Sequence, residues 1–205
     1  IKDLLTHMSG LTYNFMYRTN VDAAHRSSDL MRSENLEEFV NTLSKLPLEF
    51  SPGKKWNYSV STDVLGYLIE QVSGQSLDEY FKKNIFEPLG MEDTDFECPD
   101  DKLSRLASLY EYNQSGNPKL MKVPSLDVKM MSGGGGLFST MSDYYKFASM
   151  LLNQGEMNGA RIIGRKTLQY MTSNHLPNGR DLTEMSESAF SETPYAGVGF
   201  GLGFS

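Results

Sequence analysis

The sequence predicts an α/β fold in which this chain contributes mostly helices and passes into a sheet near its C-terminal end. The clearest helix is indicated by an apolar stripe that begins at Val64 and stops at Ser73-Gly74. A polar turn over 113–117 separates two short runs of strand-forming residues, which favours a small β-hairpin. Over 197–204, glycine alternates with valine, phenylalanine and leucine, a pattern typical of a strand.

The first 46 residues are predicted to form two helices separated by a long loop. Apolar residues at helical spacing run up to Met8, and the pattern breaks at Ser9-Gly10, so a first helix ends there. No clear period follows over 11–34, where we expect a loop. Asn35 is suited to cap the next helix, which is predicted over 36–46.

The later elements follow from cap and stop signals. Ser76 caps a second helix directly after the clearest one, and Pro88-Leu89-Gly90 ends it, so the two helices form a hairpin. The remaining predicted elements are strands at 107–112 and 119–123, a helix capped within 139–143 and ending at Leu152, a short helix over 165–171, a loose polar segment over 172–194, and the strand over 197–204.

Composition excludes several classes of function. The 205 residues include 39% hydrophobic and 22% charged residues, which is ordinary for a globular domain. The net charge is -7 and the Lys and Arg residues are scattered, so we expect no nucleic-acid partner. No apolar stretch approaches the roughly 18 to 20 residues of a membrane span. Because Ile1 already lies in a helical pattern, we expect the natural protein to continue upstream, and the compartment and oligomeric state stay open.

The sequence predicts neither a metal site nor a cofactor. Cys98 is the only cysteine, and its acidic neighbours disfavour a reactive thiolate, so we interpret it as a bystander. His7, His25 and His175 have no metal-ligand spacing among them. The glycine run at 133–136 lacks the Lys-Ser/Thr of a phosphate-binding loop.

Tyr58 is the candidate proton carrier. It follows a turn and directly precedes the clearest helix, so it is expected on a loop at a helix N-terminus. A phenol, with an ordinary pKa of about 10, is a poor base at neutral pH, but an ammonium group or a helix N-terminus stabilises its ionised form. The alternative is that Tyr58 is an amphipathic loop residue and that Ser59 or Ser61 caps the helix. Spacing alone does not separate these interpretations.

Five phrases, in order, resemble the class C β-lactamase-like serine hydrolases, and the tyrosine phrase has the form of the esterase branch. They are Leu4 to Leu11, Pro52 to Gly66, Glu87 to Met91, Ser132 to Asp143, and Gly199 to Gly203. The resemblance implies the class C β-lactamase-like α/β fold. Residues 1–205 would form part of one such domain, comprising the helical portion and the start of the returning sheet.

The resemblance also implies a mechanism. In this family a serine within Ser-x-x-Lys attacks an acyl carbonyl and a tyrosine carries its proton, a role that falls to Tyr58. Ser51 and Lys54 match the letters, but Pro52 and Gly53 between them make a turn where the motif needs a helix. The nucleophile is therefore expected upstream of this chain, and these 205 residues alone are expected to be inactive. The closing motif is expected after Ser205, since Lys166-Thr167-Leu168 reads as a helix start.

Several residues are candidates for substrate binding. Val60 stands where class C β-lactamases have an asparagine that reaches the antibiotic, so an ester is favoured over a β-lactam as the small-molecule substrate. Tyr13, with Phe15 and Tyr17, could line an acyl pocket, or serve in a core or lid. Gly134 and Gly135 could let backbone approach substrate, or simply permit tight packing. The other candidate functions are a β-lactamase or D-alanyl peptidase of the same mechanism, and a non-catalytic ligand-binding relative.

Overall fold

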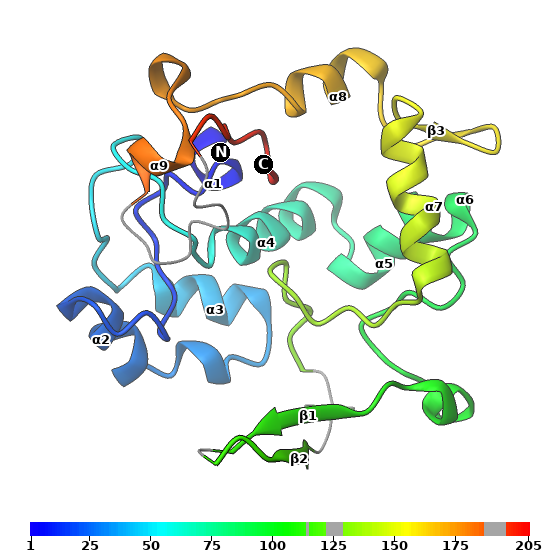
Figure 1. The fold of residues 1–205 in the computed structure, drawn as a ribbon, viewed down its shortest axis with the longest axis horizontal. Helices are drawn as coiled ribbons and strands as arrows, with labels where there is room; N and C mark the ends of the chain where they lie inside the picture. The colour runs from blue at the N-terminus through cyan, green and yellow to red at the C-terminus, as the bar shows by residue number, and fades with distance from the viewer. Residues whose placement is uncertain (114, 122–128, 187–195) are drawn as a thin grey trace.

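The computed structural model describes residues 1–113, 115–121, 129–186 and 196–205. Figure 1 shows a body of helices around α4, with a hairpin of two strands at one edge. The helical elements are α1 (Lys2–Leu5), α2 (Asn20–Ser27), η1 (Leu30–Arg32), α3 (Leu36–Leu43), α4 (Ser61–Ser73), α5 (Leu77–Phe81), η2 (Lys82–Phe86), α6 (Glu87–Leu89), η3 (Asp100–Arg105), α7 (Met141–Leu152), α8 (Arg165–Met171), η4 (Pro177–Gly179) and α9 (Leu182–Met185).

The strands form two antiparallel hairpins. β1 (Leu109–Tyr112) pairs with β2 (Pro118–Met121), with Leu109 opposite Met121 and Tyr112 opposite Pro118. The predicted hairpin is therefore confirmed, although residues 122 and 123 of its predicted second strand lie outside the described residues. A shorter hairpin of β3 (Glu156–Met157) and β4 (Ala160–Arg161) was not predicted.

The helix α4 holds a central place because α1, α3 and α5 all contact it (Figure 1). Its apolar stripe and the αL conformation of Gly74 at its C-cap match the sequence prediction. The predicted second helix is also present, but it runs through α5, a π-helical turn at η2, and α6. Asn35 and Thr140 cap α3 and α7 by accepting backbone N–H bonds, as the sequence indicates.

The predicted loop over 11–34 is wrong in part, because it contains α2. Thr19 and Asp22 form a reciprocal capping box, in which each side chain accepts a hydrogen bond from the backbone N–H of the other residue. This Thr-x-x-Asp signal is readable in the sequence. The helix was not predicted because so short a segment shows no clear apolar period.

The predicted strand over 197–204 is also wrong. Residues 196–205 are described without a strand, and their backbone bonds go to three separate positions of the preceding segment. Leu182 N–H donates to the Val198 carbonyl, His175 N–H to that of Phe200, and Leu202 N–H to that of Met171. A strand requires a continuous partner in register, and the described residues do not supply one to this segment.

The loose polar segment predicted over 172–194 contains η4 and α9. Asp181 starts α9 by accepting a hydrogen bond from the Glu184 N–H. Residues 187–194 of that segment lie outside the described residues. In the part of the chain that is described, no helix has both the length and the apolar character needed to cross a membrane.

Two hydrophobic clusters lie on either side of the loop that carries Tyr58. One joins Trp56 to Phe200 and α9, and Tyr58 packs against it. The other joins Val60 to Phe39 and η1, and Tyr13 packs against it. The loop is therefore held between two parts of the core, which gives its side chains defined directions.

Candidate active site

The loop before α4 is fixed by backbone and side-chain hydrogen bonds on both sides of Tyr58. The Trp56 N–H donates to the Met185 carbonyl at 2.9 Å, and the Asn57 N–H to the His7 carbonyl at 2.9 Å. The buried Asn57 side chain donates to the Leu11 carbonyl at 2.8 Å. Because these bonds reach α9 as well as two segments near the N-terminus, the position of Tyr58 depends on parts of the chain that are far apart in sequence.

Tyr58 is half-buried and lies between two other rings. Its ring centroid is 5.2 Å from that of His7 and 5.2 Å from that of Tyr13. Burial lowers the pKa of His7 to about 4, so the imidazole beside Tyr58 is neutral at neutral pH. His7 Nδ1 lies 3.3 Å from Ser59 Oγ, within hydrogen-bonding distance.

A chain of buried hydroxyl groups ties the start of α4 to the turn after α1. Ser59 Oγ is 2.8 Å from Ser61 Oγ, which is 2.7 Å from Ser9 Oγ. All three side chains are buried. Such fully bonded polar networks specify one arrangement of the backbone, because each group that lost its partner would remain buried and unsatisfied.

Tyr58 borders a cavity of about 410 Å³. Thr62, in the first turn of α4, lies on the same wall, and the backbone at Gly133 and Gly134 forms another part. The full lining is His7, Trp56, Tyr58, Thr62, Gly133, Gly134, Phe200, Gly203, Phe204 and Ser205. A phenol, a hydroxyl and peptide groups thus face one space that also has aromatic walls, a combination typical of small-molecule sites.

Asp63 fixes the glycine run against α4. Its buried carboxylate accepts hydrogen bonds from the Ser132 hydroxyl at 2.5 Å and from the Gly134 N–H at 3.2 Å. A Cβ at Gly133 would lie 2.2 Å from the Thr62 carbonyl oxygen, so only glycine permits this approach. Burial raises the pKa of Asp63, although the bonds from Ser132 and Gly134 oppose that effect.

The structure brings some of the predicted site residues together. Tyr58 and Gly134 line the cavity. Tyr13 is not among the lining residues, but its hydroxyl lies behind the wall, 3.1 Å from where a Cβ on Gly134 would be. Phe15 stacks on Tyr13 at 4.8 Å between centroids, whereas Tyr17 is 75% exposed and lies under Arg26.

Two of the predicted substrate contacts are not at the cavity. Val60 is 1% exposed and packs with Leu30, Phe39 and Leu43 in the core. Val60 is the N-cap residue of α4, and its side chain packs in the core cluster with Phe39. Gly135 is exposed, and a Cβ there would meet no atom within 4 Å. Neither position supports the predicted contact with substrate.

Apart from Tyr58 and Gly134, the lining residues were not predicted from the sequence as site residues. These are His7, Trp56, Thr62, Gly133, Phe200, Gly203, Phe204 and Ser205. All of them except Phe204 and Ser205 lie within the five phrases that carry the family resemblance, so position in a phrase was a signal for most of them. Which of four successive glycines meets α4 is set only by tertiary contact.

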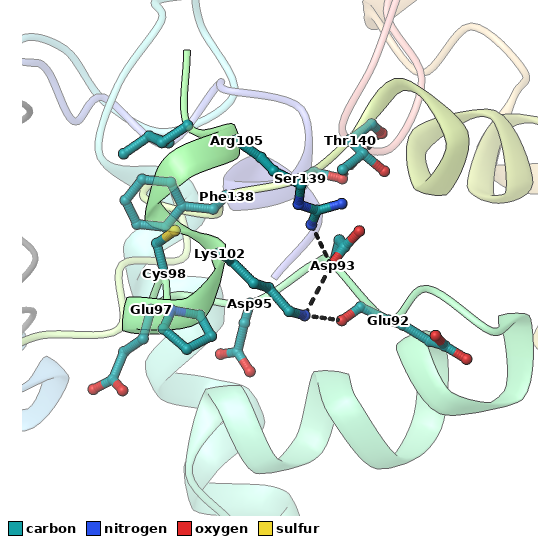
Figure 2. Close-up of a pocket in the computed structure, with 12 residues that line it drawn as sticks. Glu92, Asp93, Asp95, Glu97, Cys98, Lys102, Arg105, Phe138, Ser139 and Thr140 are labelled. Carbon is teal, nitrogen blue, oxygen red and sulfur yellow. Dashed lines mark hydrogen bonds and ion pairs between the residues drawn. The ribbon is translucent and has the colours of Figure 1, made fainter. Parts of the chain in front are cut away.

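A second cleft, of about 150 Å³, lies between η3 and the segments 92–97 and 138–140 (Figure 2). Asp93 pairs there with Lys102 at 2.8 Å and with Arg105 at 2.7 Å, and these cations lower the pKa of Asp93 to about 2. Cys98 also lines this cleft. Among the residues that the structure describes, no three His, Cys, Asp or Glu side chains form a group suited to a metal ion. The charges of this cleft therefore stabilise one another.

Comparison with known proteins identifies the family of this chain. The model of the beta-lactamase family matches residues 1–204. This chain belongs to the beta-lactamase family. It is 31% identical over 209 residues to protein Rv1367c of Mycobacterium tuberculosis, covering 100% of this chain and 50% of that protein. It is 29% identical over 215 residues to lovastatin esterase of Penicillium rubens, covering 99% and 53%.

A solved family structure extends the comparison to three dimensions. EstCE1, described as a hydrolase with promiscuous acyltransferase activity, superimposes with a TM-score of 0.75 at 26% identity, covering 98% of this chain and 54% of that one. The beta-lactamase-like α/β fold predicted from the sequence phrases is thereby confirmed, and the similar family members include esterases. The chain spans about half the length of the curated relatives it matches.

Proposed function

We propose that the protein containing this chain is a serine hydrolase that cleaves carboxylic esters through an acyl-enzyme intermediate. Tyr58 is the general base, and the nucleophilic serine of a Ser-x-x-Lys motif is supplied by sequence upstream of Ile1. The observation that carries the proposal is that Tyr58 borders an open cavity directly before α4, beside a neutral His7. Similarity to an esterase and to a hydrolase with acyltransferase activity supports the same class of reaction.

In the proposed chemistry Tyr58 first accepts a proton from the serine and then returns it to the leaving alcohol. Tyr58 takes the proton of the serine hydroxyl as the serine oxygen bonds to the ester carbonyl carbon. When the tetrahedral intermediate collapses, the alcohol leaves with that proton and the acyl group stays on the serine. Water then attacks the acyl-enzyme, with Tyr58 again as base, and releases the carboxylic acid.

The cavity suits a small-molecule substrate in size and chemistry. Its volume, about 410 Å³, falls within the range of about 300 to 1,000 Å³ usual for ligand pockets. Thr62 and the backbone at Gly133 and Gly134 offer polar contacts, and the rings of Trp56 and Phe200 offer apolar ones. The buried Val60 presents no amide to an acylamide group, which favours an ester over a β-lactam.

The test uses the full-length protein with short nitrophenyl esters and, in parallel, a chromogenic cephalosporin. Tyr58→Phe removes only the hydroxyl, and we expect ester turnover to fall by roughly 100- to 10,000-fold, the usual contribution of a general base. The melting temperature should stay the same. Tyr112→Phe, on the exposed strand β1, is the matched control and should behave as the unmodified protein.

Three results would contradict the proposal in different ways. Unchanged ester turnover in Tyr58→Phe would mean that another group takes the proton. Faster hydrolysis of the cephalosporin than of the esters would favour a β-lactamase. Ligand binding without turnover of any substrate would favour a non-catalytic relative. The 205 residues expressed alone are expected to be inactive, since the proposed nucleophile lies outside them.

A further inference from the structure

Tyr13 and Tyr58 are in ring contact, and of the two only Tyr58 lines the cavity. The ring planes of Tyr13 and Tyr58 meet at 42°, and the two side chains are hydrogen-bonded to each other. A second hydrogen bond joins Tyr13 to the side chain of Thr62. The three hydroxyl groups therefore form a hydrogen-bonded series in which Thr62 can donate to Tyr13 and Tyr13 can donate to the Tyr58 oxygen.

The surroundings of Tyr13 hold it in its protonated form. Its ring is half-buried, stacked on Phe15 and packed against the cluster that contains Val60. Burial and the nearby negative charge of Asp63 raise the pKa of Tyr13 well above its usual value. At neutral pH Tyr13 therefore keeps the proton that it can donate.

The groups around Tyr58 differ in what they can donate. His7 approaches from the turn after α1 and is neutral, with its Nδ1 directed to Ser59. Asp63 on α4 lies beyond Tyr13 and carries hydrogen bonds from Ser132 and Gly134. Tyr13, from the segment before α2, is the neighbour whose hydroxyl reaches the phenol oxygen of Tyr58.

We infer that Tyr13 is a positioning residue that donates a hydrogen bond to the Tyr58 oxygen, so that Tyr58 and not Tyr13 carries the negative charge during the reaction. This inference rests on the proposed function of Tyr58 and replaces the prediction that Tyr13 lines an acyl pocket. A hydrogen bond to an ionised oxygen is stronger than one between neutral groups, so the bond favours the phenolate of Tyr58 over its phenol. Adjacent ionisable groups with different surroundings commonly divide their roles in this way.

The position of Gly134 supports this role. A Cβ at Gly134 would lie 3.1 Å from the Tyr13 hydroxyl and 3.0 Å from Thr62 Oγ1, so the glycine backbone lies directly beside both hydroxyl groups, and of the two tyrosines only Tyr58 lines the cavity. Substrate would meet Tyr58 directly but would be separated from Tyr13 by that backbone. Removing the Tyr13 hydroxyl should therefore change proton transfer more than substrate binding.

The test measures kcat and KM for a nitrophenyl ester over a range of pH in the full-length protein. Tyr13→Phe keeps the ring stacked on Phe15 and removes the donor. We expect kcat to fall roughly tenfold or more, the effect of losing a hydrogen bond to a charged group, with little change in KM. The acidic limb of the kcat/KM profile should move to higher pH, since the phenolate of Tyr58 has lost its donor.

Thr62→Val provides a second variant that also covers the case of a misfolded Tyr13→Phe protein. It removes the donor to Tyr13 together with one hydroxyl of the cavity wall, so a change in KM is compatible with the inference, but the pH profile should shift in the same direction by a smaller amount. Tyr112→Phe is the control and should leave the profile in place. A raised KM with an unmoved pH profile in Tyr13→Phe would overturn the inference and assign Tyr13 to the substrate pocket.

Parallel measurement of Tyr58→Phe separates this inference from the proposed function. Full activity of Tyr58→Phe would contradict the proposed function itself. An inactive Tyr58→Phe together with a wild-type pH profile for Tyr13→Phe and Thr62→Val would contradict only the role of Tyr13.

Discussion

The cleft beside η3 and the cavity beside α4 contrast in how their polar groups are used. In the cleft beside η3, Asp93 is engaged by both Lys102 and Arg105, and Lys102 also donates to the Glu92 carbonyl (Figure 2). In the cavity beside α4, the phenol of Tyr58 faces open space next to a neutral His7. The more highly charged cleft thus holds Asp93 in ion pairs with two cations, whereas the less charged one presents a phenol to the cavity.

Gly133→Ala should break the cavity beside α4 and give the largest effect. The added Cβ would lie 2.2 Å from the Thr62 carbonyl oxygen, a backbone atom that cannot rotate away, so the glycine run must move off α4. We expect a loss of roughly 1–3 kcal/mol of unfolding free energy, typical of overpacking. Ester turnover should fall at least about tenfold. Denaturant unfolding and ester hydrolysis by the full-length protein measure both.

Gly135→Ala is the matched control for this change. A Cβ at Gly135 meets no atom within 4 Å, so unfolding free energy should stay within about 0.5 kcal/mol and turnover should be unchanged. A raised KM in Gly135→Ala would instead restore the sequence prediction that this glycine contacts substrate. Unchanged stability and turnover in Gly133→Ala would mean that the glycine run does not lie against α4.

Asp63→Asn removes the buried charge beside the glycine run and should change how the stability of the protein depends on pH. Burial raises the pKa of Asp63, so the folded state binds its proton more tightly than the unfolded state does. Its contribution to stability is therefore fully present below the ordinary value of 3.8 and declines as the pH rises through that value toward the folded-state pKa. Asparagine keeps an acceptor oxygen and has no charge to desolvate, so the variant should lack this decline.

The measurement is denaturant unfolding of the unmodified protein and Asp63→Asn at a series of pH values. Near neutral pH we expect the variant to be as stable or more stable, by up to roughly 1 kcal/mol, as is common when a buried charge is replaced. A variant that is clearly less stable at neutral pH would show that the ionised carboxylate is needed to hold Ser132 and Gly134.

Asp93→Asn, in the cleft beside η3, should give the smallest effect. Lys102 and Arg105 lower the pKa of Asp93, so its stabilising contribution is present above the ordinary value of 3.8 and is lost as the pH falls through about 2. Because this pair is exposed to solvent, we expect only a slight fall in melting temperature at neutral pH. Ester turnover should not change, and Cys98→Ala in the same cleft should leave it unchanged too. A loss of turnover in either variant would move the active site to this cleft.

The elements predicted best are those whose signals are local. The stripe of α4 and the caps Asn35 and Thr140 depend on residues within one or two turns, and the structure has them where they were predicted. The failed strand over 197–204 shows the opposite case. Its alternating pattern is compatible with a strand, but the described chain offers no continuous partner for it.

The candidate site divides in the same way. By itself the sequence determined that Tyr58 lies on a loop before a strong helix and that its surrounding phrases resemble one family of serine hydrolases. Only the tertiary structure decided that Val60 is in the core and that Tyr13 is hydrogen-bonded to Tyr58. The physical reason is that helices and caps arise from neighbours in the chain, whereas the direction of a side chain and its partner across 45 residues are set by packing.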